Sequence, residues 1–119
     1  MIKNKTNRFP IFVGGIGAGK TVKAKEHMGN RPYISFQAND IQLDDVYSYP
    51  KNHGIIIEDV HYKPNKEKIL QILYTIENVV LTSINEKDVP KPIMNLCVRK
   101  RLGKIDKRQL NIKKLAPNS

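Results

Sequence analysis

The chain has 119 residues, 39% of them hydrophobic, and a formal net charge of +10. This length suits one domain with a modest core and excludes two. No apolar run reaches the roughly 20 residues of a membrane span, and no signal-peptide core follows the basic N-terminus, so we expect no membrane partner. Cys97 is the only cysteine, which excludes an internal disulfide and favours a reducing, cytoplasmic location.

The positive charge is concentrated near the C-terminus. Residues 1–86 carry 11 Lys/Arg against 9 Asp/Glu, whereas residues 87–119 carry 10 against 2. Such a basic segment attracts polyanions, nucleic acid above all, and a solvated lysine-rich tail is the alternative. The candidate DNA or RNA contacts are Arg99, Lys100, Arg101, Lys104, Lys107 and Arg108. We expect contacts to phosphates, which are independent of sequence and sensitive to salt.

The first part of the chain predicts strands that alternate with helices. Phe9 to Val13 reads as a short apolar strand, and a glycine-rich stretch follows it at once. Gly19 to Met28 favours a helix that ends at residues 29–30, which are Gly-Asn. Tyr33 to Phe36 predicts a second strand, and a short helix is expected around Ile41 to Val46.

Three consecutive isoleucines, Ile55 to Ile57, follow a turn at residues 52–54. Because they show no alternation with polar residues, we expect both faces to be buried, as in a central parallel strand. Asn65 is placed to cap the next helix. The apolar positions of that helix follow the spacing i, i+3, i+4, i+7 and are Ile69, Ile72, Leu73 and Ile76.

The last elements repeat the alternation. Residues 79–83 (VVLTS) predict a buried strand, residues 90–96 a short helix and residues 97–102 a final strand. About five strands alternating with helices build a parallel sheet with helices on both faces. We therefore predict an α/β three-layer sandwich, with residues 1–102 as the core domain and residues 103–119 as a basic C-terminal tail.

The glycine-rich stretch satisfies the pattern G-x-x-x-x-G-K-[ST] between a predicted strand and a predicted helix, the context of a P-loop. Glycines let backbone N–H groups approach a phosphate closely, and the helix adds the positive end of its dipole. Lys20 would reach the β- and γ-phosphates, and the Thr21 hydroxyl would ligate Mg²⁺. The predicted cofactors are ATP and Mg²⁺, and the binding residues are Gly14, Gly15, Ile16, Gly17, Ala18, Gly19, Lys20, Thr21 and Val22.

Two acids end the isoleucine strand. Glu58 would hold Mg²⁺ together with Thr21, directly or through water, and Asp59 would orient or deprotonate the attacking water. In the alternative frame Asp59 is the metal partner, and Val60 stands where a base belongs.

The strand of residues 79–83 is expected next to the strand that precedes the glycine-rich stretch. Thr82, Ser83 or Asn85 would then present a hydroxyl or an amide to the water or to the γ-phosphate. Ordinary turn chemistry is the alternative for these residues. His61 follows the acidic pair and could approach the site, but the pattern favours a surface position.

Together these segments resemble the AAA+ branch of P-loop ATPases, especially replication initiators, helicase loaders and clamp loaders. IIIEDVHYKPNKEKILQIL (residues 55–73) is similar to the Walker B segment and following helix of bacterial initiators. VVLTSINEKDVPKPIMNLC (residues 79–97) is similar to the sensor-1 strand and short helix of initiators and clamp loaders. The resemblance spans about residues 9–102 and implies a Mg²⁺-dependent ATPase, a sensor-1 group at Ser83 or Asn85, and homo- or hetero-oligomeric rings or filaments.

Two departures from that family are visible. Clamp loaders place an arginine between Ser and Cys at the end of the short helix, where this chain has Asn95-Leu96-Cys97, with Arg99 and Arg101 as nearby substitutes. The 17 residues after Leu102 are too few for the family's helical lid. We therefore expect a minimal core without a lid, and slow hydrolysis or nucleotide-dependent binding.

Three functions agree with these patterns. The first is an ATP-binding and ATP-hydrolysing protein that acts in nucleic-acid handling, such as replication, loading or the maintenance of a microbial or viral mobile element. The second is a small-molecule kinase, because GGIGAGK (residues 14–20) also resembles the loop of nucleoside kinases and dephospho-coenzyme A kinase. The third is a non-hydrolysing assembly subunit in which the loop serves as a switch.

Overall fold

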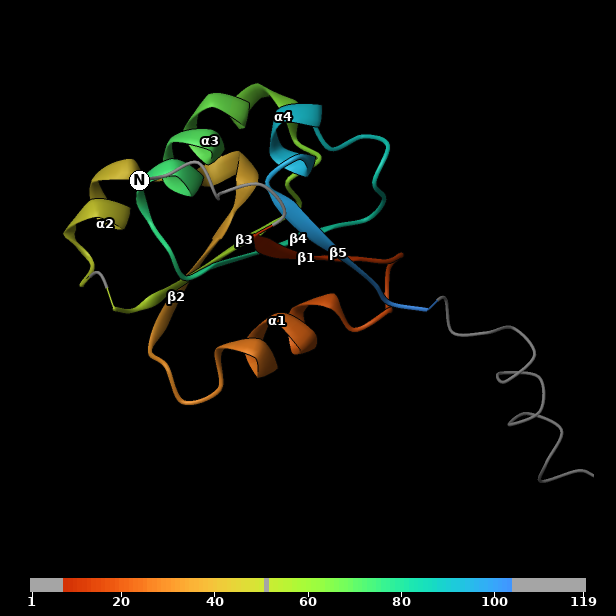
Figure 1. The fold of residues 1–119 in the computed structure, drawn as a ribbon, viewed down its shortest axis with the longest axis horizontal. Coiled ribbons are helices and arrows are strands. Elements are labelled where there is room, and N and C mark those ends of the chain that lie inside the picture. Colours follow the sequence, from red (N-terminus) through yellow and green to blue (C-terminus); the bar gives the residue numbers. More distant parts are fainter. Residues whose placement is uncertain (1–7, 51, 104–119) are drawn as a thin grey trace, which may run out of the picture.

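The computed structural model describes residues 8–50 and 52–103. Within them, five parallel strands form one sheet in the order β2-β3-β4-β1-β5. The strands are β1 (Phe9–Val13), β2 (Tyr33–Gln37), β3 (Gly54–Glu58), β4 (Val79–Ser83) and β5 (Cys97–Arg101). One face of the sheet is covered by α1 (Lys20–Met28), and the other lies under α2 (Leu43–Ser48), α3 (Lys66–Thr75) and α4 (Lys91–Met94) (Figure 1). The predicted three-layer α/β fold is confirmed.

The element boundaries differ from the prediction at a few places. The second helix begins at Leu43, after a short 3-10 turn, η2 (Ala38–Asp40), so the expected start at Ile41 was wrong. Asn65 ends a further 3-10 turn, η3 (Lys63–Asn65), and precedes α3, but its side chain does not cap that helix. The Asn65 amide instead donates a hydrogen bond of 2.6 Å to the Ala38 carbonyl and ties η3 to η2.

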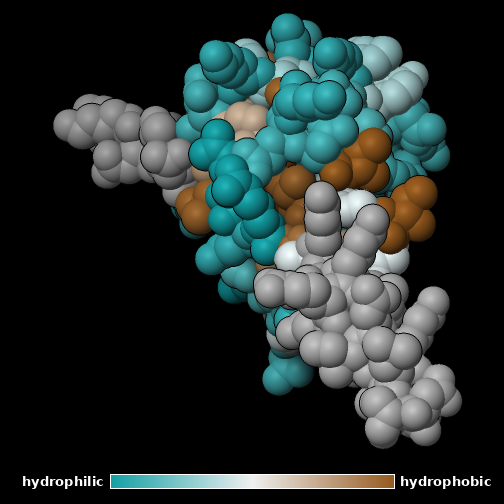
Figure 2. Space-filling view, turned by 90° about the vertical axis from the view of Figure 1, so that its right-hand side faces the viewer, coloured by the Kyte–Doolittle hydropathy of each residue, from teal (hydrophilic) through white to brown (hydrophobic). Residues whose placement is uncertain are grey.

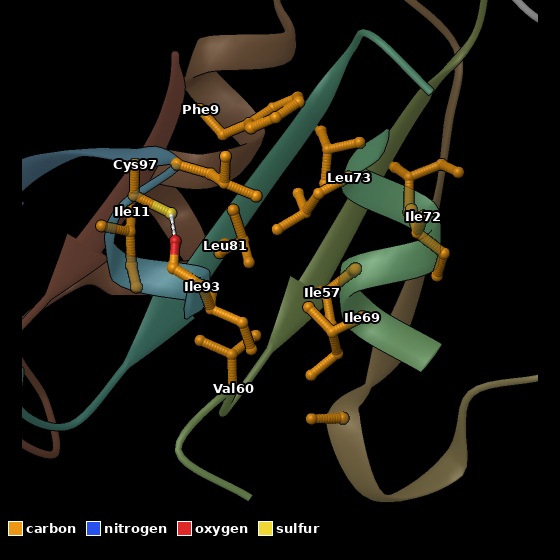
Figure 3. Close-up of a cluster of buried hydrophobic side chains, with 14 of the residues drawn as sticks. Phe9, Ile11, Ile57, Val60, Ile69, Ile72, Leu73, Leu81, Ile93 and Cys97 are labelled. Atoms are coloured by element: carbon orange, nitrogen blue, oxygen red, sulfur yellow. Dashed lines mark hydrogen bonds between the residues drawn. The ribbon is translucent and has the colours of Figure 1, made fainter. Parts of the chain in front are cut away.

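The sheet separates two hydrophobic clusters because side chains alternate between its faces. The larger cluster lies under α3 and α4, where Ile57, Leu81 and Ile11 from three strands pack against Ile69 and other helix residues (Figure 3). The smaller cluster lies under α1 and is formed by Phe12, Ala24, Met28, Ile56 and Val80. Ile55, Ile56 and Ile57 are all at most 2% exposed, which confirms a strand buried on both faces.

Cys97 belongs to the larger cluster and behaves as a small apolar residue. Its side chain is buried, and its thiol donates to the Ile93 carbonyl at 3.2 Å (Figure 3). Burial raises the pKa of the Cys97 thiol to about 12, against the opposing charge of Arg99. The thiolate, which is the reactive form, is therefore disfavoured.

No helix within residues 8–50 and 52–103 combines the length and the apolar character that crossing a bilayer requires.

The central position of Ile57 gives a test of the core. Replacing Ile57, which is fully buried, with Ala leaves a cavity and should lower the free energy of unfolding by about 2–5 kcal/mol in urea titrations. The matched control is Ile84→Ala, because the Ile84 side chain is 40% exposed, and its effect should be about 0.5 kcal/mol or less. Equal effects of the two substitutions would contradict the burial described here.

Candidate functional site

The glycine-rich loop joins the end of β1 to the start of α1. Gly17 and Gly19 have φ angles of +81° and +88°, a region that glycine adopts without steric cost. The Gly14 N–H donates to the Ser83 carbonyl at 3.1 Å, which ties the start of the loop to the end of β4. Ile16 at the loop tip is 99% exposed, so the loop lies open to solvent.

Gly14 and Gly15 meet different surroundings. A Cβ atom on Gly14 would lie 2.8 Å from the Ala18 Cβ and 3.3 Å from the Leu102 Cβ, closer than the side chains allow without movement. A Cβ on Gly15 would meet no atom within 4 Å. The first glycine is therefore required by packing inside the loop, and the second faces open space.

The first turn of α1 meets the end of β3. The Thr21 hydroxyl donates a hydrogen bond of 2.5 Å to Glu58 Oε1, across 37 positions of sequence. Glu58 follows Ile56 by two residues, so both side chains face α1. The threonine and one acid of the predicted pair are thus in direct contact.

Lys20 lies one residue before Thr21 and turns back toward the loop. Its ammonium group donates to the Gly15 carbonyl at 3.1 Å. The positive charge is therefore held next to the backbone of the loop, although no acidic partner is present among the described residues.

Asp59 has an unusual backbone conformation. Its φ of +62° makes it the one described residue other than glycine with a positive φ. The Asp59 N–H donates to Thr82 Oγ1 at 3.1 Å, and the next N–H, of Val60, donates to the Thr82 carbonyl at 2.9 Å. Bonds to both the side chain and the backbone of Thr82 therefore hold the strained turn. The Asp59 carboxylate has no hydrogen bond or ion pair within the described part of the chain.

Ser83 is the last residue of β4, Asn85 lies two residues beyond it, and the two side chains have different environments. The Ser83 hydroxyl is buried, donates to the Asn85 carbonyl at 2.7 Å and lies 3.3 Å from His61 Nδ1. The Asn85 side chain is occupied by Asp88, since its Oδ1 accepts from the Asp88 N–H at 2.8 Å and its Nδ2 donates to Asp88 Oδ2 at 2.9 Å. Asn85 therefore organises a turn, and Ser83 connects that turn to His61.

The arginines of β5 are paired with an acid. Arg99 and Arg101 both donate to Glu86, which lies in the segment between β4 and α4. The hydrogen bond from Arg101 lowers the pKa of the Glu86 carboxyl most, and Arg99 lowers it further. Lys100 points to the opposite face and is exposed. Lys104, Lys107 and Arg108 lie outside the described residues.

The donor set fits a magnesium nucleotide. Thr21 and Glu58 offer hydroxyl and carboxylate oxygens at one point, the ligand types that Mg²⁺ takes from proteins. The open side of Gly15 and the positive φ angles of Gly17 and Gly19 leave the loop backbone accessible to phosphate oxygens. Within the described residues no three His, Cys, Asp or Glu side chains cluster as a metal site. Water and phosphate oxygens would therefore have to complete a magnesium shell.

Comparison with solved structures relates the fold to an AAA domain. The chain superposes on the AAA domain of FIGL-1, solved in complex with ADP, with a TM-score of 0.63 and 12% sequence identity. The match covers 94% of this chain and 49% of that chain, so the present chain spans about half of its length. No protein-family model matches the sequence, and no curated protein does. At 12% identity this likeness shows that the two chains share a fold.

His61 approaches the site, the less favoured of its two expected positions, since its Nδ1 lies 3.3 Å from the Ser83 hydroxyl. Two other features of the site could not be found from sequence patterns: Thr82 supports Asp59, and Leu102 closes over Gly14. Each of these contacts joins residues that are distant in sequence or brought together by the sheet. The signal in the sequence for such contacts was the polar residues that follow the buried strands β3 and β4.

The packing around Gly14 provides a test of the loop. Gly14→Ala should lower the free energy of unfolding by about 1–3 kcal/mol, because the new methyl group collides with Ala18 and Leu102. Gly15→Ala, whose methyl group meets no neighbour, should change it by about 0.5 kcal/mol or less. Urea unfolding of the two variants measures both effects, and a larger loss for Gly15→Ala would contradict the described loop.

Proposed function

We propose that this chain binds ATP with Mg²⁺ at the loop of residues 14–21 and hydrolyses it. The observation that carries this proposal is the contact between Thr21 and Glu58 at 2.5 Å. It supports the frame in which Glu58, and not Asp59, is the metal partner. In that frame Asp59 is the next residue and is available to act on water. The ADP in the FIGL-1 structure, a protein of the same fold, also supports nucleotide binding.

The chain's own groups have separate roles in this proposal. The loop backbone supplies N–H donors, and Lys20 exchanges the Gly15 carbonyl for a phosphate oxygen. Thr21 and Glu58 would hold Mg²⁺, which supplies positive charge against the developing negative charge of phosphoryl transfer. Because Glu58 already accepts a hydrogen bond from the Thr21 hydroxyl, its carboxylate is oriented before any ligand arrives.

Asp59 is the proposed acceptor of the water proton. Its backbone is fixed by Thr82, and its carboxylate has no competing partner among the described residues. A carboxylate held in this way can orient a water molecule and remove its proton as the water attacks. Ser83 is the proposed sensor-1 group, whereas the amide of Asn85 is engaged by Asp88.

Substitution of these residues separates binding from hydrolysis. Lys20→Ala should weaken ATP binding by about 100-fold, because a charge-assisted contact to phosphate is lost. Glu58→Gln and Asp59→Asn should keep ATP binding but lower phosphate release by about 100-fold or more. Calorimetry and a phosphate-release assay with Mg²⁺ measure the two steps. Glu67→Gln and Asp44→Asn, both at exposed positions on helices, are the matched controls.

The same assays distinguish the other candidate functions. ATP binding without phosphate release in the unmodified protein would support a non-hydrolysing subunit and contradict the ATPase. Transfer of phosphate to a small acceptor instead of water would support a kinase. Absence of ATP binding would contradict all three.

We also propose that the ATPase acts on nucleic acid, which is supported by the distribution of charge. The described residues hold 13 Lys/Arg against 10 Asp/Glu, and the remaining residues hold 8 against 1. The excess of positive charge is therefore greatest among the residues that the structure does not describe, and such an excess attracts a phosphate backbone.

Salt dependence tests this partner. If the six basic residues from Arg99 to Arg108 contact phosphates, the logarithm of the affinity for single-stranded DNA should fall with the logarithm of salt concentration with a slope of about −4. Fluorescence anisotropy with a labelled oligonucleotide measures it. Replacing Lys104, Lys107 and Arg108 with Gln should reduce the slope by about 2. Undetectable binding at about 50 mM salt, or an affinity independent of salt, would contradict the proposal.

A further inference from the structure

A hollow on the surface lies between η3, the segment before α4, α4 itself and β5. Its charged lining consists of Lys63, Lys87, Lys91, Arg99 and Glu86, and its apolar lining includes Val89 and Met94. The lining residues come from three stretches of chain, namely η3, residues 86–95 and β5, which the fold brings together (Figure 1). We refer to this hollow as the basic groove.

The charges of the basic groove are unevenly paired. Arg99 donates to Glu86, but the side-chain ammonium groups of Lys63, Lys87 and Lys91 have no ion pair or hydrogen bond within the described part of the chain. The other acid nearby in sequence, Asp88, already accepts a hydrogen bond from the Asn85 amide. Four cations thus face one carboxylate, which is itself shared with Arg101.

The basic groove and the nucleotide loop occupy different faces of the sheet. Met94 and Val89 belong to the cluster under α3 and α4, and Arg99 lies on the same face as Cys97. Glu58 and Thr21 lie on the face covered by α1. A ligand in the groove therefore does not compete for space with a nucleotide in the loop.

Glu86 lies between the groove and the loop. It also lines a second hollow, together with Gly15, Ile84 and Arg101. Figure 2 shows the right-hand side of the view in Figure 1. Hydrophobic residues appear among hydrophilic ones on that side, in agreement with the exposure of Ile16 and Ile84. Arg99 already donates a hydrogen bond to the Glu86 carboxylate. An anion that enters the groove must therefore compete with Glu86 for Arg99.

We propose that the basic groove binds the sugar-phosphate backbone of nucleic acid through Lys63, Lys87, Lys91 and Arg99, and that Glu86 is a built-in competitor for Arg99. Unpaired lysines act as point charges toward phosphates and need no base contacts. The concave shape favours a narrow polyanionic chain over a flat lipid surface. The proposal rests on the proposed nucleic-acid function and adds a surface of the folded domain to the basic C-terminal residues.

The test compares two double variants of the full chain. Lys87→Gln with Lys91→Gln removes two charges from the groove, and Lys25→Gln with Lys68→Gln removes two exposed charges from α1 and α3, outside it. The groove variant should weaken binding to a labelled single-stranded DNA by about 10-fold near 0.1 M salt and reduce the salt slope by about 1.4. The control variant should change the affinity by less than about twofold.

Glu86→Gln is the second, independent variant. Removing the competing carboxylate should strengthen DNA binding by about threefold, the reverse of what a destabilised fold would give. Unchanged or weaker binding by Glu86→Gln in a folded protein would overturn the competitor role. Circular dichroism and ATP binding of every variant show whether the domain remains folded.

The outcomes distinguish failure of the groove from failure of the proposed function. Equal losses in the two double variants, with DNA still bound, would overturn the groove but leave nucleic-acid binding in place. Absence of DNA binding by the unmodified protein would overturn both. If the groove variant lost binding to phosphatidylserine vesicles but kept its affinity for DNA and for RNA of the same length, the groove would be a lipid site and the proposal wrong.

Discussion

The candidate site depends on β4, although the Thr21 hydroxyl and the Glu58 carboxylate both come from other elements. β4 lies between β1 and β3 and pairs in parallel with both, so that Ile57, Leu81 and Ile11 form one row across the sheet. In a parallel sheet the carboxyl ends of all strands meet at one edge. The loop that follows β1 and the acids that end β3 therefore reach the same place. Without that shared register, the hydrogen bond from Thr21 to Glu58 would not form across 37 positions of sequence.

Alternation along each strand then assigns different chemistry to the two faces. On β3, Ile56 packs under α1, and Glu58 faces the same helix at its first turn. On β5, Cys97 packs under α3 and α4, and Arg99 continues on that face toward Glu86. The sheet thus separates an oxygen-rich site from a basic groove while it holds both near the strand ends. A one-residue slip of β3 would turn Glu58 away from α1, and a one-residue slip of β5 would turn Arg99 away from Glu86.

Local patterns predicted most of the fold. The runs of isoleucine and valine and the helical spacing of Ile69, Ile72 and Leu73 located β3, β4 and α3, because burial of apolar residues follows directly from their spacing. Sequence patterns predicted less well which hydrogen-bond partner a polar side chain has. Asn65 had the sequence of a helix cap, but it donates to the Ala38 carbonyl from a different turn. Nothing local could reveal that choice, since Ala38 lies 27 positions away.

The sequence by itself determined the loop, its glycines and the acids after β3, because each depends on residue type and short-range spacing. The chain shares its fold with an AAA domain although only 12% of the aligned residues are identical. This agrees with a fold that depends on the pattern of apolar and polar residues and not on particular residues. Only the tertiary structure decided which acid meets Thr21, that Asp59 takes a positive φ, and that Glu86 binds two arginines of β5. These contacts depend on strand order and register, which arise from packing among segments that are distant along the chain.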